Sequence, residues 1–180
     1  MKARFFSAVF VVMFFSGSYV FAEESGDMYM GLSLGRASIN APPDVGASAY
    51  GSSSSFKYLL SGRIGYIGVE LAYLESGKME HACDCDTYVE FDGLELSLLG
   101  YVPINRRLNM NIKGGVVSWN LNSVVHGEKL ASISGDDITY GFGMTYDMYE
   151  RLSVRGLYEI FQGESDIEVT NFSVAILLKM

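Results

Sequence analysis

The sequence predicts an all-β fold, an eight-stranded antiparallel up-and-down transmembrane β-barrel, on three observations. Large apolar residues recur at every second position of eight segments, and a period of two residues is typical of strands rather than helices. The intervening positions are mostly small or polar and carry a few single charges. Short and long connections alternate between the segments, as they do in barrels that cross an outer membrane.

Residues 138–148 show the alternation most clearly. One face holds Tyr140, Phe142, Met144, Tyr146 and Met148, and the other holds Thr139, Gly141, Gly143, Thr145 and Asp147. Successive side chains of a strand point to opposite faces, so this segment has one apolar face and one small or polar face. A soluble protein would bury the apolar face, whereas a membrane barrel turns it towards lipid.

The first four predicted strands repeat this division in chain order. Their large apolar residues are Met28, Met30, Leu32 and Leu34 in residues 28–35, Tyr58, Leu60, Ile64 and Tyr66 in residues 58–66, Val69, Leu71 and Tyr73 in residues 69–73, and Leu94, Leu96, Leu98 and Val102 in residues 94–102. Gly, Ser and single charges are frequent at the opposite positions, which suits the narrow interior of a small barrel.

The other strands continue the pattern on both sides of residues 138–148. Their apolar residues are Leu108, Met110, Ile112 and Val116 in residues 108–116, Leu152, Val154, Tyr158 and Ile160 in residues 152–160, and Phe172, Val174, Ile176, Leu178 and Met180 in residues 172–180. Tyrosines such as Tyr66 and Tyr73 stand near both ends of the strands, as in the aromatic girdles of membrane barrels.

Six charged residues stand opposite the apolar face. They are Arg63, Glu70, Glu95, Lys113, Arg155 and Glu159. Inside a narrow lumen each charge needs a partner, because an unpaired buried ion is strongly destabilising. We therefore expect a lumen charge network that pairs the three basic residues with the three carboxylates. Eight strands enclose only enough room for side chains, so this network would plug the barrel.

The connections differ in length at the two ends of the predicted barrel. Short links are expected at residues 66–68, 103–107 and 147–151, and long ones at residues 37–56, 75–88, 120–137 and 162–170. Short turns face the periplasm and long loops face outward in outer-membrane barrels, and an even strand number places both chain ends on the periplasmic side. The run Ser52–Ser55 gives the first loop the composition of a mobile segment.

The first 22 residues have the features of a signal peptide. Lys2 and Arg4 precede an apolar run, and small residues around Ala22 form a cleavage site. We expect residues 1–22 to be removed and residues 23–180 to form one outer-membrane barrel domain. Loss of the two positive charges changes the formal net charge from -8 to -10. An acidic chain repels phosphate backbones, which excludes nucleic acid as a partner.

Two cysteines, Cys83 and Cys85, lie in an acidic stretch between predicted strands. They could form a loop disulfide, although a spacer of one residue makes a tight ring, or remain as thiols. His81 and the neighbouring aspartates could join them around a metal ion, but two thiolates one residue apart rarely complete a tetrahedral site. We therefore expect no metal and no cofactor.

Two stretches resemble the OmpA-like and opacity-type superfamily of eight-stranded outer-membrane barrels. The first is Gly62–Tyr73, and the second is Tyr140–Tyr146 followed by Leu152–Glu159. The resemblance implies that the protein contacts outer-membrane lipids and lipopolysaccharide, and that its outward loops bind host surface proteins. The superfamily usually ends its last strand on an aromatic residue that the outer-membrane assembly machinery recognises, and this chain has Met180 there.

Two alternatives to a binding barrel remain open at the level of sequence. Some eight-stranded barrels are enzymes that modify lipopolysaccharide, using His with Ser and an acidic residue. Here the histidines, His81 and His126, lie in predicted loops, and neither is followed two residues later by Ser, so we expect no enzyme. A soluble lipocalin-like carrier would place its apolar face inside and its charges outside, which is the reverse of the predicted arrangement.

Overall fold

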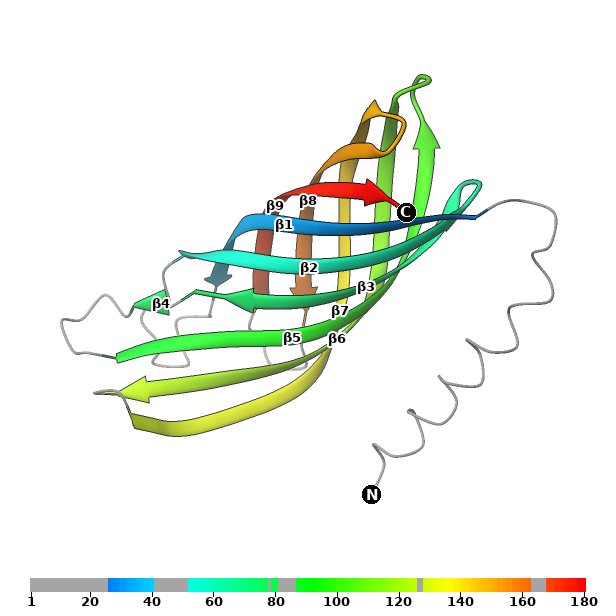
Figure 1. Cartoon of the computed structure of the whole chain (residues 1–180). Coiled ribbons are helices and arrows are strands. Elements are labelled where there is room, and N and C mark those ends of the chain that lie inside the picture. Colours follow the sequence, from blue (N-terminus) through cyan, green and yellow to red (C-terminus); the bar gives the residue numbers. More distant parts are fainter. Residues whose placement is uncertain (1–25, 41–51, 78, 81–86, 126–127, 163–167) are drawn as a thin grey trace.

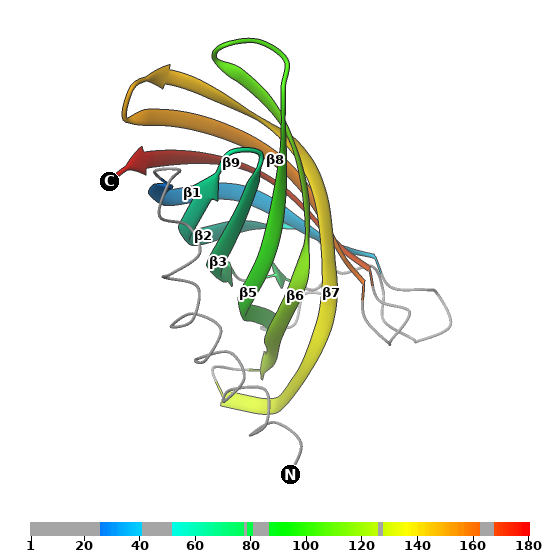
Figure 2. The same cartoon turned by 90° about the vertical axis from the view of Figure 1, so that its right-hand side faces the viewer.

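Eight long antiparallel strands form a closed ring in the computed structural model, which describes residues 26–40, 52–77, 79–80, 87–125, 128–162 and 168–180 (Figures 1 and 2). The strands are β1 (Asp27–Asn40), β2 (Ser52–Ile64), β3 (Ile67–Ser76), β5 (Thr87–Pro103), β6 (Leu108–Val125), β7 (Glu128–Tyr149), β8 (Leu152–Gln162) and β9 (Glu168–Lys179). Pairing of β1 with β9 and of β3 with β5 closes the ring. The short β4 (Met79–Glu80) pairs with β5 alone. The predicted eight-stranded up-and-down barrel is confirmed.

The alternation of the sequence becomes an alternation of burial. Along β3, exposed and buried residues alternate without interruption from Ile67 to Ser76. Large apolar side chains point outward and stay exposed, as Leu34 (66 %) and Phe142 (63 %) show. The inward side chains of the same strands are buried, and many of them are polar. The described residues contain no helix with the length and hydropathy needed to cross a membrane.

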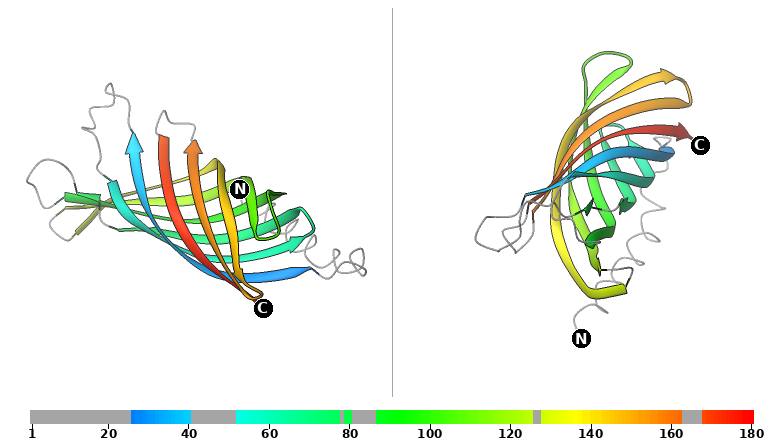
Figure 3. Two further views of the ribbon diagram at one scale, coloured as in Figure 1. Left: turned by 90° about the horizontal axis from the view of Figure 1, so that it is seen from above. Right: turned by 90° about the vertical axis from the view of Figure 1, so that its left-hand side faces the viewer.

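The strands meet in short turns at one end of the barrel, which we call the turn end. Both described chain termini lie there, since the main-chain N–H of Met180 donates to the carbonyl of Met28 at 2.9 Å. The β2–β3 connection is only Gly65 and Tyr66, and Gly65 adopts a φ of 55° that favours glycine. Figure 3 shows the strands slanting across the barrel from this end to the opposite one, which we call the loop end.

The prediction of a mobile serine segment is wrong for Ser52–Ser55. These residues form the start of β2, where Ser52 pairs with Ser38 and Ser55 pairs with Gly35 of β1. Ser53 and Ser55 point inward and are buried, whereas Ser52 and Ser54 are exposed. Alternation of burial therefore persists in a segment where every side chain is the same, because main-chain pairing does not depend on side-chain hydropathy.

The predicted loop over residues 120–137 is also wrong. It is a continuation of β6 and β7, which stay paired from Asn120 with Ser134 outward to Val125 with Glu128. In Figures 1 and 2 this hairpin extends beyond the neighbouring strands at the loop end. The extension lacks the apolar outward face that marks the rest of the strands, which is why the sequence pattern ends before the strands do.

The outward apolar band ends at a polar residue on every long strand. Towards the loop end, the next outward residue of each long strand is polar: Arg36, Ser54, Glu75, Asp92, Ser118, Asp136, Gln162 and Thr170. Below this boundary lie exposed apolar residues such as Leu94, Val116 and Ile138. The boundary separates an apolar belt from a polar region at the loop end, as expected where a barrel leaves the hydrocarbon core of a membrane.

Candidate functional site

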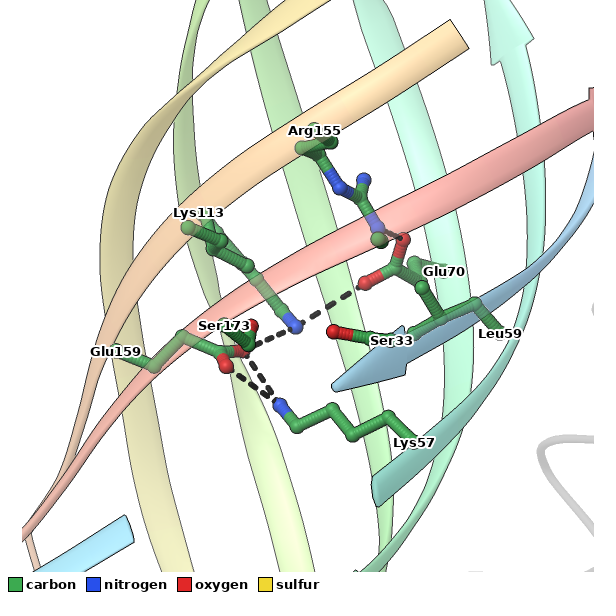
Figure 4. Close-up of a pocket in the computed structure, with 10 residues that line it drawn as sticks. Ser33, Lys57, Leu59, Glu70, Lys113, Arg155, Glu159 and Ser173 are labelled. Carbon is green, nitrogen blue, oxygen red and sulfur yellow. Dashed lines mark hydrogen bonds and ion pairs between the residues drawn. The ribbon is translucent and has the colours of Figure 1, made fainter. Parts of the chain in front are cut away.

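Six charged side chains meet in the barrel interior, which we call the charge cluster. They are Lys57 from β2, Glu70 from β3, Glu95 from β5, Lys113 from β6, and Arg155 and Glu159 from β8. Each occupies an inward position of its strand, and all are buried, with 5 % or less of the side chain exposed. Figure 4 shows five of them, Lys57, Glu70, Lys113, Arg155 and Glu159, converging from opposite walls of the barrel.

Lys113 occupies the centre of the charge cluster. Its Nζ lies 3.1 Å from Oε1 of Glu70, 2.9 Å from Oε1 of Glu95 and 2.7 Å from Oε1 of Glu159. One ammonium group therefore contacts three carboxylates that come from three different strands. This geometry ties β6 to β3, β5 and β8 across the lumen.

Two further cations balance the carboxylates. Nζ of Lys57 lies 2.6 Å from Oε2 of Glu159 and 3.1 Å from Oε2 of Glu95. The Nη2 group of Arg155 pairs with Oε2 of Glu70. Three positive and three negative charges thus compensate one another. Charges taken out of water are tolerated when they are paired and hydrogen-bonded in this way.

Neutral polar side chains add hydrogen bonds to two carboxylates of the charge cluster. Asn171 donates from Nδ2 to Oε2 of Glu159 at 3.0 Å, and Ser97 donates from Oγ to Oε1 of Glu95 at 2.8 Å. Ser55 in turn donates to Oδ1 of Asn171 at 2.6 Å. The bonds to Glu159 and Glu95 help to orient these carboxylates, because each occupies an acceptor position that the ammonium groups leave open, and the bond from Ser55 orients Asn171.

The structure brings together five of the six residues that the sequence singles out and places Arg63 elsewhere. Arg63 lies at the turn end, where its Nε donates to the carbonyl of Gly65 at 2.9 Å and its guanidinium carbon lies 4.2 Å from the centre of the Tyr101 ring. Arg63 occupies an inward position of its strand, as the cluster residues do. Its position two residues before the turn takes it out of their reach.

Lys57 is the member of the charge cluster that the sequence reasoning missed. The predicted strand begins at Tyr58, one residue too late to include it. Lys57 has the same parity as Leu59 and Ser61, both of which are inward and buried. Extending the alternation towards the serine run would have identified it.

An apolar layer lies on the loop side of the charge cluster. Leu74, Phe91, Val117 and Phe161 pack together with 6 % or less of each side chain exposed, and Trp119 and Val169 lie against them partly buried. Nζ of Lys57 stands 5.3 Å from the centre of the Phe161 ring, so the two layers are in direct contact. Trp119 also donates from Nε1 to Asp137 at 2.7 Å. The interior is therefore layered along the barrel axis.

Little free space remains among the charged side chains. The cavity lined by Lys57, Glu70, Lys113, Arg155 and Glu159, among others, has a volume of about 10 Å³, roughly the room for a single water molecule. In the part of the chain that the structure describes, no three His, Cys, Asp or Glu side chains are grouped to hold a metal ion.

Several predicted features lie outside the described residues. The predicted disulfide of Cys83 and Cys85 is among them, together with the two histidines, His81 and His126, and the predicted signal peptide in residues 1–22.

Comparison with known proteins points to one family. A family model described as an outer membrane protein beta-barrel domain matches residues 7–179. No curated protein sequence matches.

Solved structures with a similar fold come from several bacteria. Neisserial surface protein A is 12 % identical, with a TM-score of 0.68 over 87 % of this chain and 100 % of that one. Ail, the attachment invasion locus protein of Yersinia pestis, is 13 % identical, with a TM-score of 0.64 over 87 % of this chain and 99 % of that one. The N-terminal β-barrel domain of OprF from Pseudomonas aeruginosa is 12 % identical, with a TM-score of 0.53 over 86 % and 100 %. At these identities the likeness shows a shared fold.

Proposed function

This chain belongs to the outer membrane protein beta-barrel domain family, and we propose that it is an integral envelope protein with a plugged lumen that binds partners through its loop end. One observation carries the plug: six buried charges neutralise one another across the lumen and leave a cavity of only about 10 Å³. A carrier of lipocalin type would need an apolar cavity in the same place, so the charged filling argues against a carried ligand.

The loop end supports the proposed binding role. Here β5, β6 and β7 continue past the apolar band, and their outward residues become polar, as Asp92, Ser118 and Asp136 illustrate. Asn120 and Asn122 of β6 both donate to Asp92 of β5, at 3.1 and 3.4 Å. Side chains bonded across strands in this way give the extension a defined polar surface. Such a surface outside the membrane is available to partners.

The proposed partners are host surface proteins, in an adhesion or host-interaction role. Ail, a structural relative in fold, is an attachment invasion locus protein and has been solved with the heparin analogue sucrose octasulfate. The outward residues that end the band include three carboxylates, Glu75, Asp92 and Asp136, and one cation, Arg36, so carboxylates predominate there. Carboxylates repel sulfates, so we propose a protein partner for this chain in place of a sulfated glycan.

Further parts of the proposal concern export of the protein, its insertion into the outer membrane and its contacts there. We propose that residues 1–22 direct export and are removed, that residues 23–180 are inserted by the outer-membrane assembly machinery, and that the outward apolar band contacts lipid and lipopolysaccharide. We also propose that the protein acts by binding, without catalysis. The pairing of Cys83 with Cys85 stays a prediction.

Excision of the β6–β7 extension tests the binding role. Replacing residues 121–133 with Asn-Gly joins Asn120 to Ser134, which are paired neighbours in the barrel, and an Asn-Gly pair suits a two-residue hairpin. The refolded mature protein is expected to bind at least one immobilised matrix protein or serum factor. The excised variant is expected to bind it about tenfold more weakly or worse, the loss produced by about 1.4 kcal/mol of contact energy.

A matched control replaces residues 163–167, which join β8 to β9, with a Gly-Ser linker of the same length. Both variants should keep the shift in gel mobility between unboiled and boiled samples that a folded barrel shows. Binding that is equal in the excised variant and the native barrel would contradict a role for the extension, and absence of binding to any matrix or serum protein would contradict the binding function.

A further inference from the structure

The turn side of the charge cluster contains polar atoms without partners. Among the described residues, Nε and Nη1 of Arg155, Oδ1 of Asn111 and Oγ of Ser61 are buried without a hydrogen-bond partner. So is Oγ1 of Thr139, which pairs in register with Phe161 on the loop side. Arg155 is 1 % exposed and Asn111 is fully buried. A buried donor or acceptor left without a partner is destabilising, because it has lost its hydrogen bonds to water and gained none. Four such atoms in one region therefore indicate a bound ligand.

Strand register and one hydrogen bond relate these unpartnered atoms to Arg155. Ser61 pairs in register with Glu70, which is the carboxylate bound by Arg155. Asn111 donates from Nδ2 to Oγ1 of Thr145 at 2.6 Å, and Thr145 pairs in register with Arg155. Ser61 on β2 and Asn111 on β6 are therefore each linked to Arg155 through one intervening residue, Glu70 and Thr145 respectively.

A second cavity lies on this side, towards the turn end. It has a volume of about 10 Å³ and is lined by residues that include Ser61, Thr145, Tyr101, Arg63 and Asp147. Arg63 and Asp147 are only half-buried, so this cavity borders solvent at the mouth of the barrel. The first cavity, lined by Arg155 itself, has a similar volume. Each has roughly the room for one water molecule.

The chemistry of the orphaned atoms identifies the ligand as water. A small anion could accept from Arg155, but it would leave the acceptor Oδ1 of Asn111 without a donor. Water can accept from Nε or Nη1 of Arg155 and donate to Asn111 or Ser61. The charge cluster is already neutral, which removes the electrostatic drive for an anion.

We propose that the turn-side half of the lumen is a hydrated vestibule, in which bound water completes the hydrogen bonds of Arg155, and that the apolar layer keeps the loop-side half dry. This inference rests on the plugged lumen proposed above. It adds the level along the barrel axis beyond which water is excluded. Val117, with no exposed surface, and Phe161 lie in an apolar layer. Among the described residues, Oγ1 of Thr139 is the single unpartnered side-chain atom beside this layer, so the layer offers water few partners. Water in an apolar space loses its hydrogen bonds and is excluded.

Reaction of single cysteines with silver ion tests the vestibule, because this ion is small, hydrated and specific for thiols. The background is the full mature chain with Cys83→Ser and Cys85→Ser, refolded into lipid nanodiscs. Ser61→Cys reports on the vestibule, Val117→Cys on the apolar layer, and Glu150→Cys in an exposed turn gives the unhindered rate. Unreacted thiol is counted by a maleimide after unfolding, and the gel-mobility shift confirms that each variant is folded.

The expected result is that Ser61→Cys reacts within about tenfold of the Glu150→Cys rate, whereas Val117→Cys reacts at least about 100-fold more slowly, because an ion must lose its water to enter an apolar layer. Ser153→Cys, which lines the same cavity, replaces Ser61→Cys if the latter does not fold. Slow reaction at both vestibule positions would overturn the hydrated vestibule and leave the plug intact. Fast reaction at Val117→Cys would overturn the dry layer and the plug together.

Discussion

At the residue scale, the stability of the interior depends on charge compensation at a few positions. Glu159 is the clearest case, since its two carboxylate oxygens contact both Lys57 and Lys113 and also accept from Asn171. Bulk water cannot replace these contacts, because Glu159 has no exposed surface. Loss of this one negative charge leaves three cations, two ammonium groups and one guanidinium, with only two carboxylates to balance them.

Glu159→Gln is therefore expected to lower the free energy of unfolding by about 3 kcal/mol, the usual effect of removing one partner of a buried ion pair. Urea titration of the barrel refolded in lipid or detergent measures it. Glu150→Gln removes the same charge from an exposed turn residue and should change stability by less than about 0.5 kcal/mol. Equal effects of the two variants would show that the charge cluster does not hold the barrel together.

At the element scale, close approach between neighbouring strands constrains β6 differently at two adjacent glycines. A Cβ at Gly115 would lie 2.2 Å from the main-chain carbonyl oxygen of Leu96 on β5, whereas a Cβ at Gly114 would meet nothing within 4 Å. Gly115 points inward and Gly114 outward, so the pair separates crowding in the lumen from exposure on the outer face. Main-chain atoms cannot move aside as a flexible side chain can.

Gly115→Ala is expected to destabilise the barrel by about 2 kcal/mol, within the range for overpacking. Gly114→Ala should be neutral or stabilise it by up to about 1 kcal/mol, because alanine reduces the freedom of the unfolded chain. Parallel urea titrations compare the two variants. A larger loss for Gly114→Ala than for Gly115→Ala would contradict the inward orientation of Gly115 and the register between β5 and β6.

The elements also show how far the sequence could be interpreted. Period-two alternation identifies every long strand and its inward face, because a closed ring with apolar groups outside leaves a side chain only two directions. It does not find the strand ends. Ser52–Ser55 and residues 120–137 have no apolar face, yet their main chains pair with neighbouring strands.

The charge cluster was partly predictable for a similar reason. Parity places Glu70, Lys113 and Arg155 inside the barrel, but which of them meet depends on the tilt and register of strands far apart in sequence. Arg63 has the correct parity and lies at the turn end instead, beside Tyr101. The sequence pattern missed Lys57 because this residue lies next to the serine run, where no apolar face marks the strand.

At the scale of the whole molecule, the outer surface is apolar and the interior contains charges, which is the reverse of the arrangement in a soluble protein. The outside carries an apolar band bounded by polar residues at the loop end, and the inside carries paired charges between the turn end and an apolar layer. The family places this barrel in the outer membrane. Outer-membrane barrels include both open channels and barrels filled by side chains, so the layers of the interior bear directly on its role.

Electrical recording from the refolded mature protein in planar lipid bilayers tests the plugged lumen most directly. Insertion is verified by the gel-mobility shift of the same preparation, so that silence cannot be attributed to failed folding. The compensated charges and the apolar layer predict a current at the level of the protein-free bilayer, without stable openings, across the range of voltages that the bilayer withstands. A steady, voltage-independent conductance that appears with each inserted barrel would contradict the plug.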